Sequence, residues 1–421
     1  MHNKFFAAVT TIVLSLTAAL TVSCAAERAK PVIIWTDRPE LASYVELFNA
    51  QQDSAQAVVV YKSPLVSALP PAKDEKTPDI IIGSWLKDSR LKKNFVPLEN
   101  VFDQKHLNPS TIYPSLLKYG AVGVHQYLLP VSFNVPLVIF SAKNTDSIPD
   151  AYMLTTDVIR DTAASFNAKN DHDIYTTMGF APSWNPDFLY VVAKMNGLSF
   201  KEKKGTYQWD DAILNKTAQY LKTWTAEKNT STTAEQDFAF KYLYTPGYRQ
   251  VESGRCLFAY TSSEELFAIP YEQLGNIDFR WIEKNKFVPV KDDIVMMGIF
   301  KHSDNTQAAQ VFLTWLMQKE TQRDLLARAE RMQLNINTFG IAGGFSSIRT
   351  VNEQLFPTYY RNLLGNLPAQ SSIMAPPSFP VRWTSFKERV VIPYLQDAAN
   401  TTLSHTQSLD DRITAWSMQF N

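Results

Sequence analysis

The sequence predicts an α/β protein of two lobes, each a mostly parallel sheet flanked by helices, joined by two or three crossover segments. Three observations support this fold class. Short apolar strands alternate with a helix near the start of the chain, which is typical of parallel sheets covered by helices. A proline-marked stretch at residues 127–140 interrupts this alternation. Without residues 1–23, the 421-residue chain leaves 398 residues, about two domains in length.

The first lobe is predicted from the pattern of residues 32–83. Val32–Trp35 is a short apolar run typical of a buried parallel strand. Asp37 is a candidate N-cap of the following helix, and Glu40 stands three residues later, as a capping box requires. Apolar strands return at residues 57–61 and 79–83. These elements favour a parallel sheet.

We interpret residues 127–140 as a stiff crossing between the lobes. Pro130 and Pro136 each fix their own φ and push the preceding residue towards an extended conformation, which excludes a continuous helix. The link between the two short strands carries Ser132, Phe133 and Asn134, which offer a hydroxyl, a ring and an amide to a ligand. A buried strand with a proline-marked entry remains the alternative.

The second lobe is predicted to be rich in helices. One helix opens at Trp184-Asn185-Pro186-Asp187, and another spans residues 210–227. The strand Cys256–Tyr260 leads into a turn in which Ser262 either caps the next helix or faces a ligand. A strand at residues 294–300 is expected to return to the first lobe, and the glycine-containing segment 334–347 to form a third crossing. The expected lobes are residues 24–133 and 294–345 for lobe 1, and residues 134–293 and 346–421 for lobe 2.

Residues 1–23 are predicted to be a lipoprotein signal peptide. Lys4 precedes an apolar run, and Leu20-Thr21-Val22-Ser23-Cys24 resembles the lipobox of bacterial lipoproteins, with Thr21 in place of the usual leucine. Cleavage and acylation of Cys24, of the palmitate type, would hold the chain at the periplasmic or extracellular face of a membrane. The alternative, an uncleaved anchor, needs a longer and less polar run.

Composition excludes several function classes. Lys plus Arg and Asp plus Glu both total 41, so no basic face for nucleic acid is expected. After Cys24 the only cysteine is Cys256, which allows no internal disulfide and reads as a buried apolar filler. The scattered histidines and the absence of a G-x-S-x-G motif predict no metal site, no cofactor and no enzyme activity.

Candidate ligand-binding residues follow the ends of the strands. In parallel sheets, ligands bind beyond the carboxyl ends of the strands. Aromatic rings offer flat apolar faces to a ligand, and charged, amide or hydroxyl groups offer it hydrogen bonds. Packing in the core is the alternative for each ring, and a purely structural ion pair is the alternative for Asp37 with Arg38. The expected contacts are Trp35, Asp37, Arg38, Ser84, Trp85, Phe133, Asn134, Trp184, Asn185, Tyr260, Ser262 and Trp281.

The order of these pieces resembles the extracellular solute-binding proteins of ABC importers, in the group of bacterial sugar-binding lipoproteins. The resemblance spreads over most of the mature chain. It implies a monomer that closes two lobes on a small solute, most often a carbohydrate, and delivers it to an ABC permease in the cytoplasmic membrane. The chain departs from the sugar-binding pattern in having a single glycine, Gly298, near Met297. The matching pieces are Val32–Trp35 with Phe48-Asn49, Thr77–Gly83, Tyr127–Phe140, Glu252–Arg255, Met297–Ser303 and Ala308–Leu316.

Three alternative functions remain open from the sequence. A surface glycosidase would need two carboxyls flanking its bond, and adjacent acids such as Asp292-Asp293 offer only a weak signal. Ferric-iron-binding relatives of this group hold the metal with a tandem tyrosine pair, which Tyr359-Tyr360 resembles. An adhesin lipoprotein would keep the fold without using the cleft.

Overall fold

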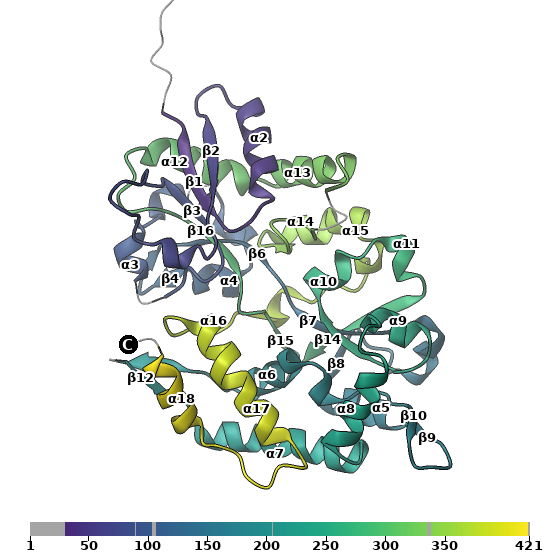
Figure 1. Ribbon diagram of the computed structural model, residues 1–421. Coiled ribbons are helices and arrows are strands. Elements are labelled where there is room, and N and C mark those ends of the chain that lie inside the picture. Colours follow the sequence, from purple (N-terminus) through teal and green to yellow (C-terminus); the bar gives the residue numbers. More distant parts are fainter. Residues whose placement is uncertain (1–29, 89, 103–106, 204, 335–337, 420–421) are drawn as a thin grey trace, which may run out of the picture.

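The computed structural model describes residues 30–88, 90–102, 107–203, 205–334 and 338–419. The chain forms two lobes, one above the other in Figure 1, and each lobe has a central sheet with helices around it. The predicted two-lobed α/β fold is confirmed. The predicted signal peptide and Cys24 lie outside the described residues. Within the described ranges, no helix is both long and apolar enough to cross a bilayer.

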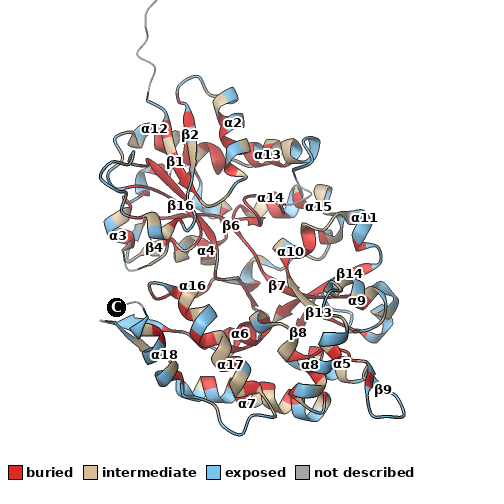
Figure 2. Cartoon of the chain, viewed as in Figure 1, coloured by how far each residue is buried: buried red, intermediate tan, exposed pale blue. Residues whose placement is uncertain are grey.

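Lobe 1 is built on a six-stranded sheet with the strand order β17-β6-β16-β3-β1-β2. Helices α2 and α12 pack on β2 and β16, and the sheet interior is buried (Figure 2). The strands are β1 (Val32–Thr36), β2 (Ala57–Tyr61), β3 (Ile80–Gly83), β6 (Leu129–Phe133), β16 (Val295–Ile299) and β17 (Phe345–Ser346). The helices are α2 (Leu41–Gln51), α3 (Leu91–Asn94), α4 (Pro114–Tyr119), α12 (Thr306–Leu316), α13 (Lys319–Arg331), α14 (Arg349–Gln354) and α15 (Phe356–Tyr359).

Lobe 2 has a four-stranded sheet with the order β13-β7-β14-β8. Its strands are β7 (Pro136–Ser141), β8 (Met153–Thr155), β13 (Ala259–Ser262) and β14 (Ile277–Glu283). Its longer helices are α5 (Thr156–Ala164), α6 (Pro186–Met195), α7 (Asp211–Lys228), α8 (Thr232–Lys241), α17 (Ile392–Ala399) and α18 (Leu409–Met418). Its shorter helices are α9 (Gly247–Glu252), α10 (Ser263–Phe267), α11 (Tyr271–Leu274) and α16 (Trp383–Phe386). Cys256 is buried, as the sequence predicted.

Both sheets are mixed, which corrects the expectation of mostly parallel sheets. Strand β1 pairs in parallel with β2 and β3, but β16 is antiparallel to both β3 and β6. In lobe 2, β7 is antiparallel to β13 and β14. The antiparallel direction of β16 follows from the point at which the second crossing returns the chain to lobe 1. Strand β16 enters lobe 1 at the edge where β3 ends, so Met296 faces Gly83 and Ile299 faces Ile80.

Among the described residues, three segments connect the lobes. The first is Asn134-Val135, between β6 of lobe 1 and β7 of lobe 2. The second, residues 284–294, contains β15 (Val288–Pro289). The third follows α15 and contains β18 (Ile373–Met374), which pairs in parallel with β15.

The segment 334–347 does not serve as the expected third crossing. Its described part follows α13 and contains β17, and both elements belong to lobe 1. Helix α14 also packs on α13 and β17. Ser347 explains this placement, because its hydroxyl donates to the carbonyl of Pro130 at 2.6 Å and its N–H donates to that of Val131 at 3.0 Å. The chain therefore returns to lobe 2 later than the expected boundary at residue 345.

Candidate functional site

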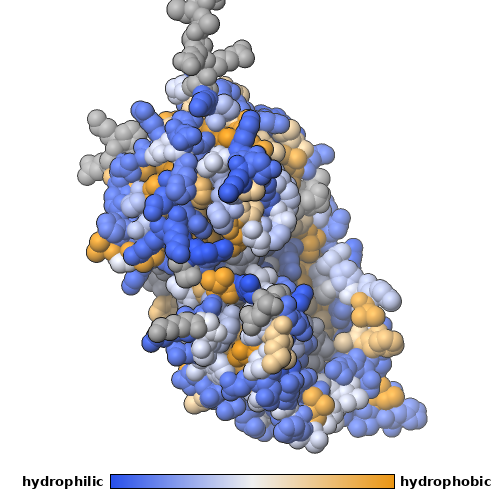
Figure 3. All heavy atoms as spheres, turned by 60° about the vertical axis from the view of Figure 1, so that its left-hand side comes forward, coloured by the Kyte–Doolittle hydropathy of each residue, from blue (hydrophilic) through white to orange (hydrophobic). Residues whose placement is uncertain are grey.

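A groove of about 710 Å³ lies between the lobes. The loops after β2 and β3 form its lobe-1 side, and the start of α16 with the preceding residues forms its lobe-2 side. The surface is hollowed between the two lobes in the space-filling view (Figure 3). The lining includes Asp37, Ser84, Trp85, Arg90, Tyr119, Phe379, Arg382 and Trp383.

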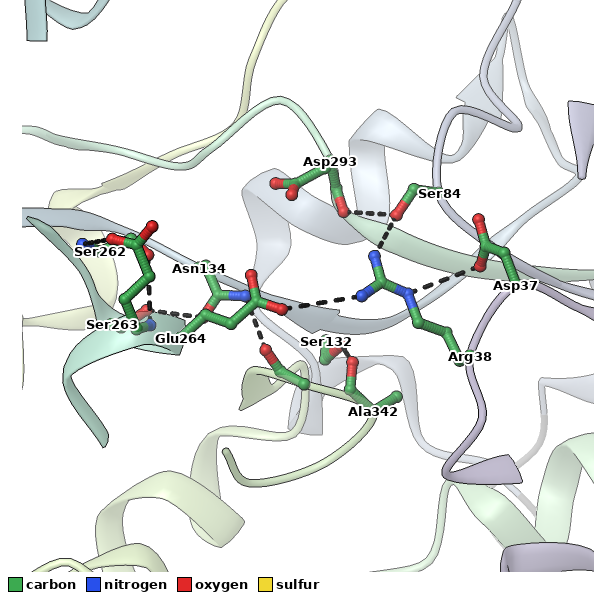
Figure 4. Close-up of polar contacts among 12 residues, drawn as sticks. Asp37, Arg38, Ser84, Ser132, Asn134, Ser262, Ser263, Glu264, Asp293 and Ala342 are labelled. Atoms are coloured by element: carbon green, nitrogen blue, oxygen red, sulfur yellow. Dashed lines mark hydrogen bonds and ion pairs between the residues drawn. The ribbon is translucent and has the colours of Figure 1, made fainter. Parts of the chain in front are cut away.

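Three predicted residues, Asp37, Arg38 and Ser84, come together where β1 and β3 end. The Arg38 guanidinium donates to the Ser84 hydroxyl at 2.6 Å, and that hydroxyl donates to the backbone carbonyl of Asp293 at 2.8 Å (Figure 4). Asp37 lies 3.5 Å from the guanidinium. Burial raises the pKa of the Asp37 carboxyl, although the charge of Arg38 acts against this rise. Parallel pairing of β1 and β3 places these side chains at one edge, as the strand-end argument predicted.

Trp85 stands beside this polar cluster and lines the groove. Its φ of 67° is uncommon for a residue with a side chain and turns the chain sharply after β3. The indole meets Phe379 edge to face, with ring centroids 6.2 Å apart. Phe379 in turn stacks on Trp383 at 4.9 Å with an interplanar angle of 14°. Three rings from both lobes therefore form one aromatic wall, in which Trp85 is half-buried and Phe379 and Trp383 are largely buried, with exposed fractions of 9% and 4%.

Sequence reasoning missed Phe379 and Trp383. Both follow the prolines at 376 and 377, in a segment without helical or strand periodicity. The available signal was the pairing of aromatic residues with turn-forming prolines in an irregular stretch. Only the third crossing brings this stretch opposite Trp85.

A smaller cavity of about 190 Å³ adjoins the groove, and Trp85 lines both spaces. Its other walls come from the start of β7, from α6 and from the second crossing. Beside it lies a buried ion pair of Lys194 with Asp292. Burial would raise the pKa of Asp292, but the Lys194 ammonium holds it below its ordinary value. The other oxygen of Asp292 accepts from the Trp383 indole at 3.0 Å, which fixes that ring.

Asn134 and Ser262 are engaged in holding the backbone. The Asn134 amide donates to the carbonyl of Gly343 at 2.8 Å, and its oxygen accepts from the Ser263 hydroxyl at 2.6 Å. Ser262 caps α10 in a reciprocal capping box with Glu265. For Ser262 the structure therefore shows the helix-cap alternative.

Trp35, Phe133 and Trp281 lie in the core, which corrects their expected place at the cleft. Their exposed fractions are 1%, 3% and 0%. The Trp281 indole donates to the backbone carbonyl of Asn366 at 2.5 Å. The Phe133 ring packs on Phe345 at 5.8 Å. The strand ends on which these residues stand are covered by other segments, so the rings fill space between elements.

Trp184, Asn185 and Tyr260 lie in lobe 2, are half-buried and are absent from the groove lining. The Trp184 indole donates to the carbonyl of Glu235 at 3.0 Å, and Asn185 caps α6 through the N–H of Asp187 at 2.9 Å. The Tyr260 hydroxyl is buried without a hydrogen-bond partner among the described residues. Burial raises the pKa of Tyr260, and the negative charge of Asp187 adds to this rise.

The tandem tyrosines lie outside the groove. The Tyr360 hydroxyl accepts from the N–H of Gly340 at 2.9 Å, and its ring packs against Phe339 at 4.9 Å. Tyr359 and Tyr360 line a separate pocket with residues of α11. Over the described ranges, no group of three or more His, Cys, Asp or Glu side chains is arranged to hold a metal ion. These contacts give Tyr360 a packing role.

Comparison with known proteins identifies the family. The profile of the bacterial extracellular solute-binding proteins matches residues 71–323. This chain belongs to that family. Its members are exported proteins that bind solutes, which agrees with the two lobes and the groove between them. A comparison with curated protein sequences gives no match.

Solved structures share the fold at low identity. The sugar-binding protein MalE from Xanthomonas citri has a TM-score of 0.66 at 14% identity, over 93% of this chain and 96% of that one. The cyclic α-maltosyl-1,6-maltose binding protein of Arthrobacter globiformis gives 0.61 at 15%, over 92% and 97%. The protein Lmo0181 of Listeria monocytogenes, in complex with cycloalternan, gives 0.60 at 14%, over 92% and 98%. These likenesses establish the two-lobed architecture.

Proposed function

We propose that this solute-binding protein captures a carbohydrate in the groove between its lobes and delivers it to an ABC permease in the cytoplasmic membrane. The observation that carries the proposal is the aromatic wall of Trp85, Phe379 and Trp383, which stands beside the polar cluster at the ends of β1 and β3. Sugars present both an apolar C–H face and a rim of hydroxyls. A ring wall next to charged and hydroxyl groups matches both features.

Each side of the groove supplies a different part of this recognition. Asp37 and Ser84 come from lobe 1, and Phe379 with Trp383 come from lobe 2. A ligand that touches both sides binds one arrangement of the lobes better than others, and it shifts the population towards that arrangement. Hinge closure at the three crossings then needs no chemical step. We therefore propose a binding role without catalysis.

The structural neighbours support carbohydrate as the solute class. The similar proteins named above bind sugars by their own descriptions. We further propose that the mature chain is a monomer, and that acylation of Cys24 holds it at the outer face of the cytoplasmic membrane. The Tyr360 hydroxyl and ring are engaged in contacts within the protein, which favours a carbohydrate ligand over ferric iron.

A thermal-shift and calorimetric screen tests the carbohydrate proposal. The probes are neutral mono-, di- and trisaccharides, including maltotriose, mannotriose and cellotriose, with ferric citrate and short peptides as comparison. A carbohydrate ligand should raise the melting temperature in proportion to the logarithm of its free concentration over Kd.

Matched variants locate the binding to the groove. Trp85→Ala and Phe379→Ala should weaken sugar binding strongly, because each change removes a ring that offers a large apolar surface to the C–H face of a sugar. Tyr244→Ala is the control, since Tyr244 is 95% exposed and is absent from the groove lining. Binding of ferric ion or peptide without any sugar response would contradict the proposal.

A further inference from the structure

The cavity of about 190 Å³ has an unusual charge arrangement. Three carboxylates and three ammonium groups line it, so their formal charges cancel. Two pairs are already formed. Lys387 lies 2.9 Å from Asp187, and Lys194 contacts Asp292. Lys291 and Asp293 remain.

The side chains of Lys291 and Asp293 line the cavity, and their charged groups are not paired with other described protein groups. Over the described part of the chain, neither the Lys291 ammonium nor the Asp293 carboxylate forms an ion pair within 4.0 Å or a side-chain hydrogen bond within 3.5 Å. Burial alone would lower the pKa of Lys291, but the surrounding carboxylates, Asp293 foremost, raise it. Lys291 therefore stays protonated, and its ammonium can donate hydrogen bonds to a ligand.

The backbone holds both residues in place. The N–H of Lys291 donates to the carbonyl of Asn134 at 2.7 Å, in the first crossing. The carbonyl of Asp293 accepts from the Ser84 hydroxyl at 2.8 Å, in lobe 1. Figure 4 shows the Asp293 carboxylate outside this hydrogen bond. A donor and an acceptor are thus fixed on one segment while their charged ends stay available.

We propose that this cavity is a subsite for one uncharged, hydroxyl-rich ring at the end of an oligosaccharide, with Lys291 donating to its oxygens and Asp293 accepting from its hydroxyls. The inference rests on the proposed carbohydrate function. A hydroxyl both donates and accepts, so neighbouring hydroxyls satisfy the two groups together. Trp85 lines both this subsite and the larger groove, so its ring can also contact the adjoining sugar unit.

Charge balance sets the specificity of the subsite. A carboxylate on the terminal ring, as in a uronic acid, would add a negative charge beside Asp293 and the paired acids. An ammonium on that ring, as in an amino sugar, would add a positive charge beside Lys291. Either addition leaves a partly buried charge uncompensated, which is costly. The subsite therefore selects neutral ends.

The test measures affinity by calorimetry for the neutral trisaccharides named above, and for the tightest of them with a uronic acid or an amino sugar at either end. Lys291→Met and Asp293→Asn should each weaken binding by about tenfold or more, because hydrogen bonds to charged groups are the strong ones. Lys291→Arg should keep more affinity than Lys291→Met. Lys286→Met and Asp150→Asn, which change exposed residues, are the matched controls.

The outcomes separate the two proposals. Unchanged affinity in Lys291→Met and Asp293→Asn, with affinity lost in Trp85→Ala, would overturn the subsite and leave the carbohydrate function standing. Tighter binding of a charged end than of the neutral one would also overturn it. No binding of any neutral sugar by the wild-type protein would overturn both. Melting temperatures of the unliganded variants show whether each one folds.

Discussion

Arg38 of lobe 1 and Glu264 of lobe 2 form an ion pair across the cleft, with 3.9 Å between the guanidinium and the carboxylate. Both side chains lie close to Gly343, whose φ is +78°. A Cβ at Gly343 would stand 3.3 Å from the Glu264 carboxylate and 3.5 Å from the guanidinium. Burial raises the pKa of Glu264, and the charge of Asp293 raises it further. The pair links the two lobes (Figure 4).

Glu264→Gln should loosen the observed arrangement of the lobes. The pair is partly exposed, so its loss should change overall stability by less than about 1 kcal/mol. Spin labels placed one in each lobe should report a broader distance distribution in the unliganded variant. Glu252→Gln is the control, because its partner Arg249 belongs to the same helix, α9. An unchanged distribution in Glu264→Gln would show that the pair does not constrain the lobes.

Trp281→Ala should be strongly destabilising, whereas Trp85→Ala should not. The fully buried Trp281 ring packs against Phe279 at 4.8 Å, and its removal should cost about 3–5 kcal/mol. The half-buried Trp85 should cost about 1 kcal/mol. Urea unfolding followed by circular dichroism measures both. A small loss of stability in Trp281→Ala would contradict the core assignment and make Trp281 a candidate ligand contact again.

Lys194→Met should destabilise the protein by about 3–5 kcal/mol, because it leaves the buried Asp292 carboxylate without its cation. The double variant Lys194→Met/Asp292→Asn removes both charges and keeps an acceptor for the Trp383 indole. It should be more stable than Lys194→Met alone. Lys201→Met, at an exposed position, is the control in the same unfolding experiment. A double variant less stable than Lys194→Met would contradict this account.

Glu235 should make stability depend on pH. Burial raises the pKa of this carboxyl, although hydrogen bonds from Ser183 and Asn229 act against the rise. The folded state therefore takes up a proton at a higher pH than the unfolded state, whose pKa is about 4.3. The contribution of Glu235 to the free energy of unfolding should fall as the pH rises from the unfolded pKa through the raised folded pKa, and it should stay low above it.

Glu235→Gln removes this titration. The melting temperature of the wild type should fall relative to that of the variant as the pH rises from about 4 to about 7. Glu227→Gln, which changes an exposed residue of α7, should follow the wild type at every pH. Parallel curves for the wild type and Glu235→Gln would mean that Glu235 has an ordinary pKa.

Local signals predicted part of the site. Asp37, Arg38, Ser84 and Trp85 follow the ends of β1 and β3, and the parallel pairing of these strands brings them together. The aromatic residues could not be assigned in the same way. A tryptophan at a strand end looks the same in the sequence whether another segment covers it, as for Trp281, or leaves it at the groove, as for Trp85.

The sequence by itself determined the α/β class, the two lobes and the first crossing near Asn134, because periodicity and proline act on neighbouring residues. Only the tertiary structure decided the direction of β16, the late return to lobe 2 after α15, and the meeting of Phe379 with Trp85. These features depend on which distant segments pack together. Such packing is set by the sum of many weak contacts over the whole molecule, which no local pattern records.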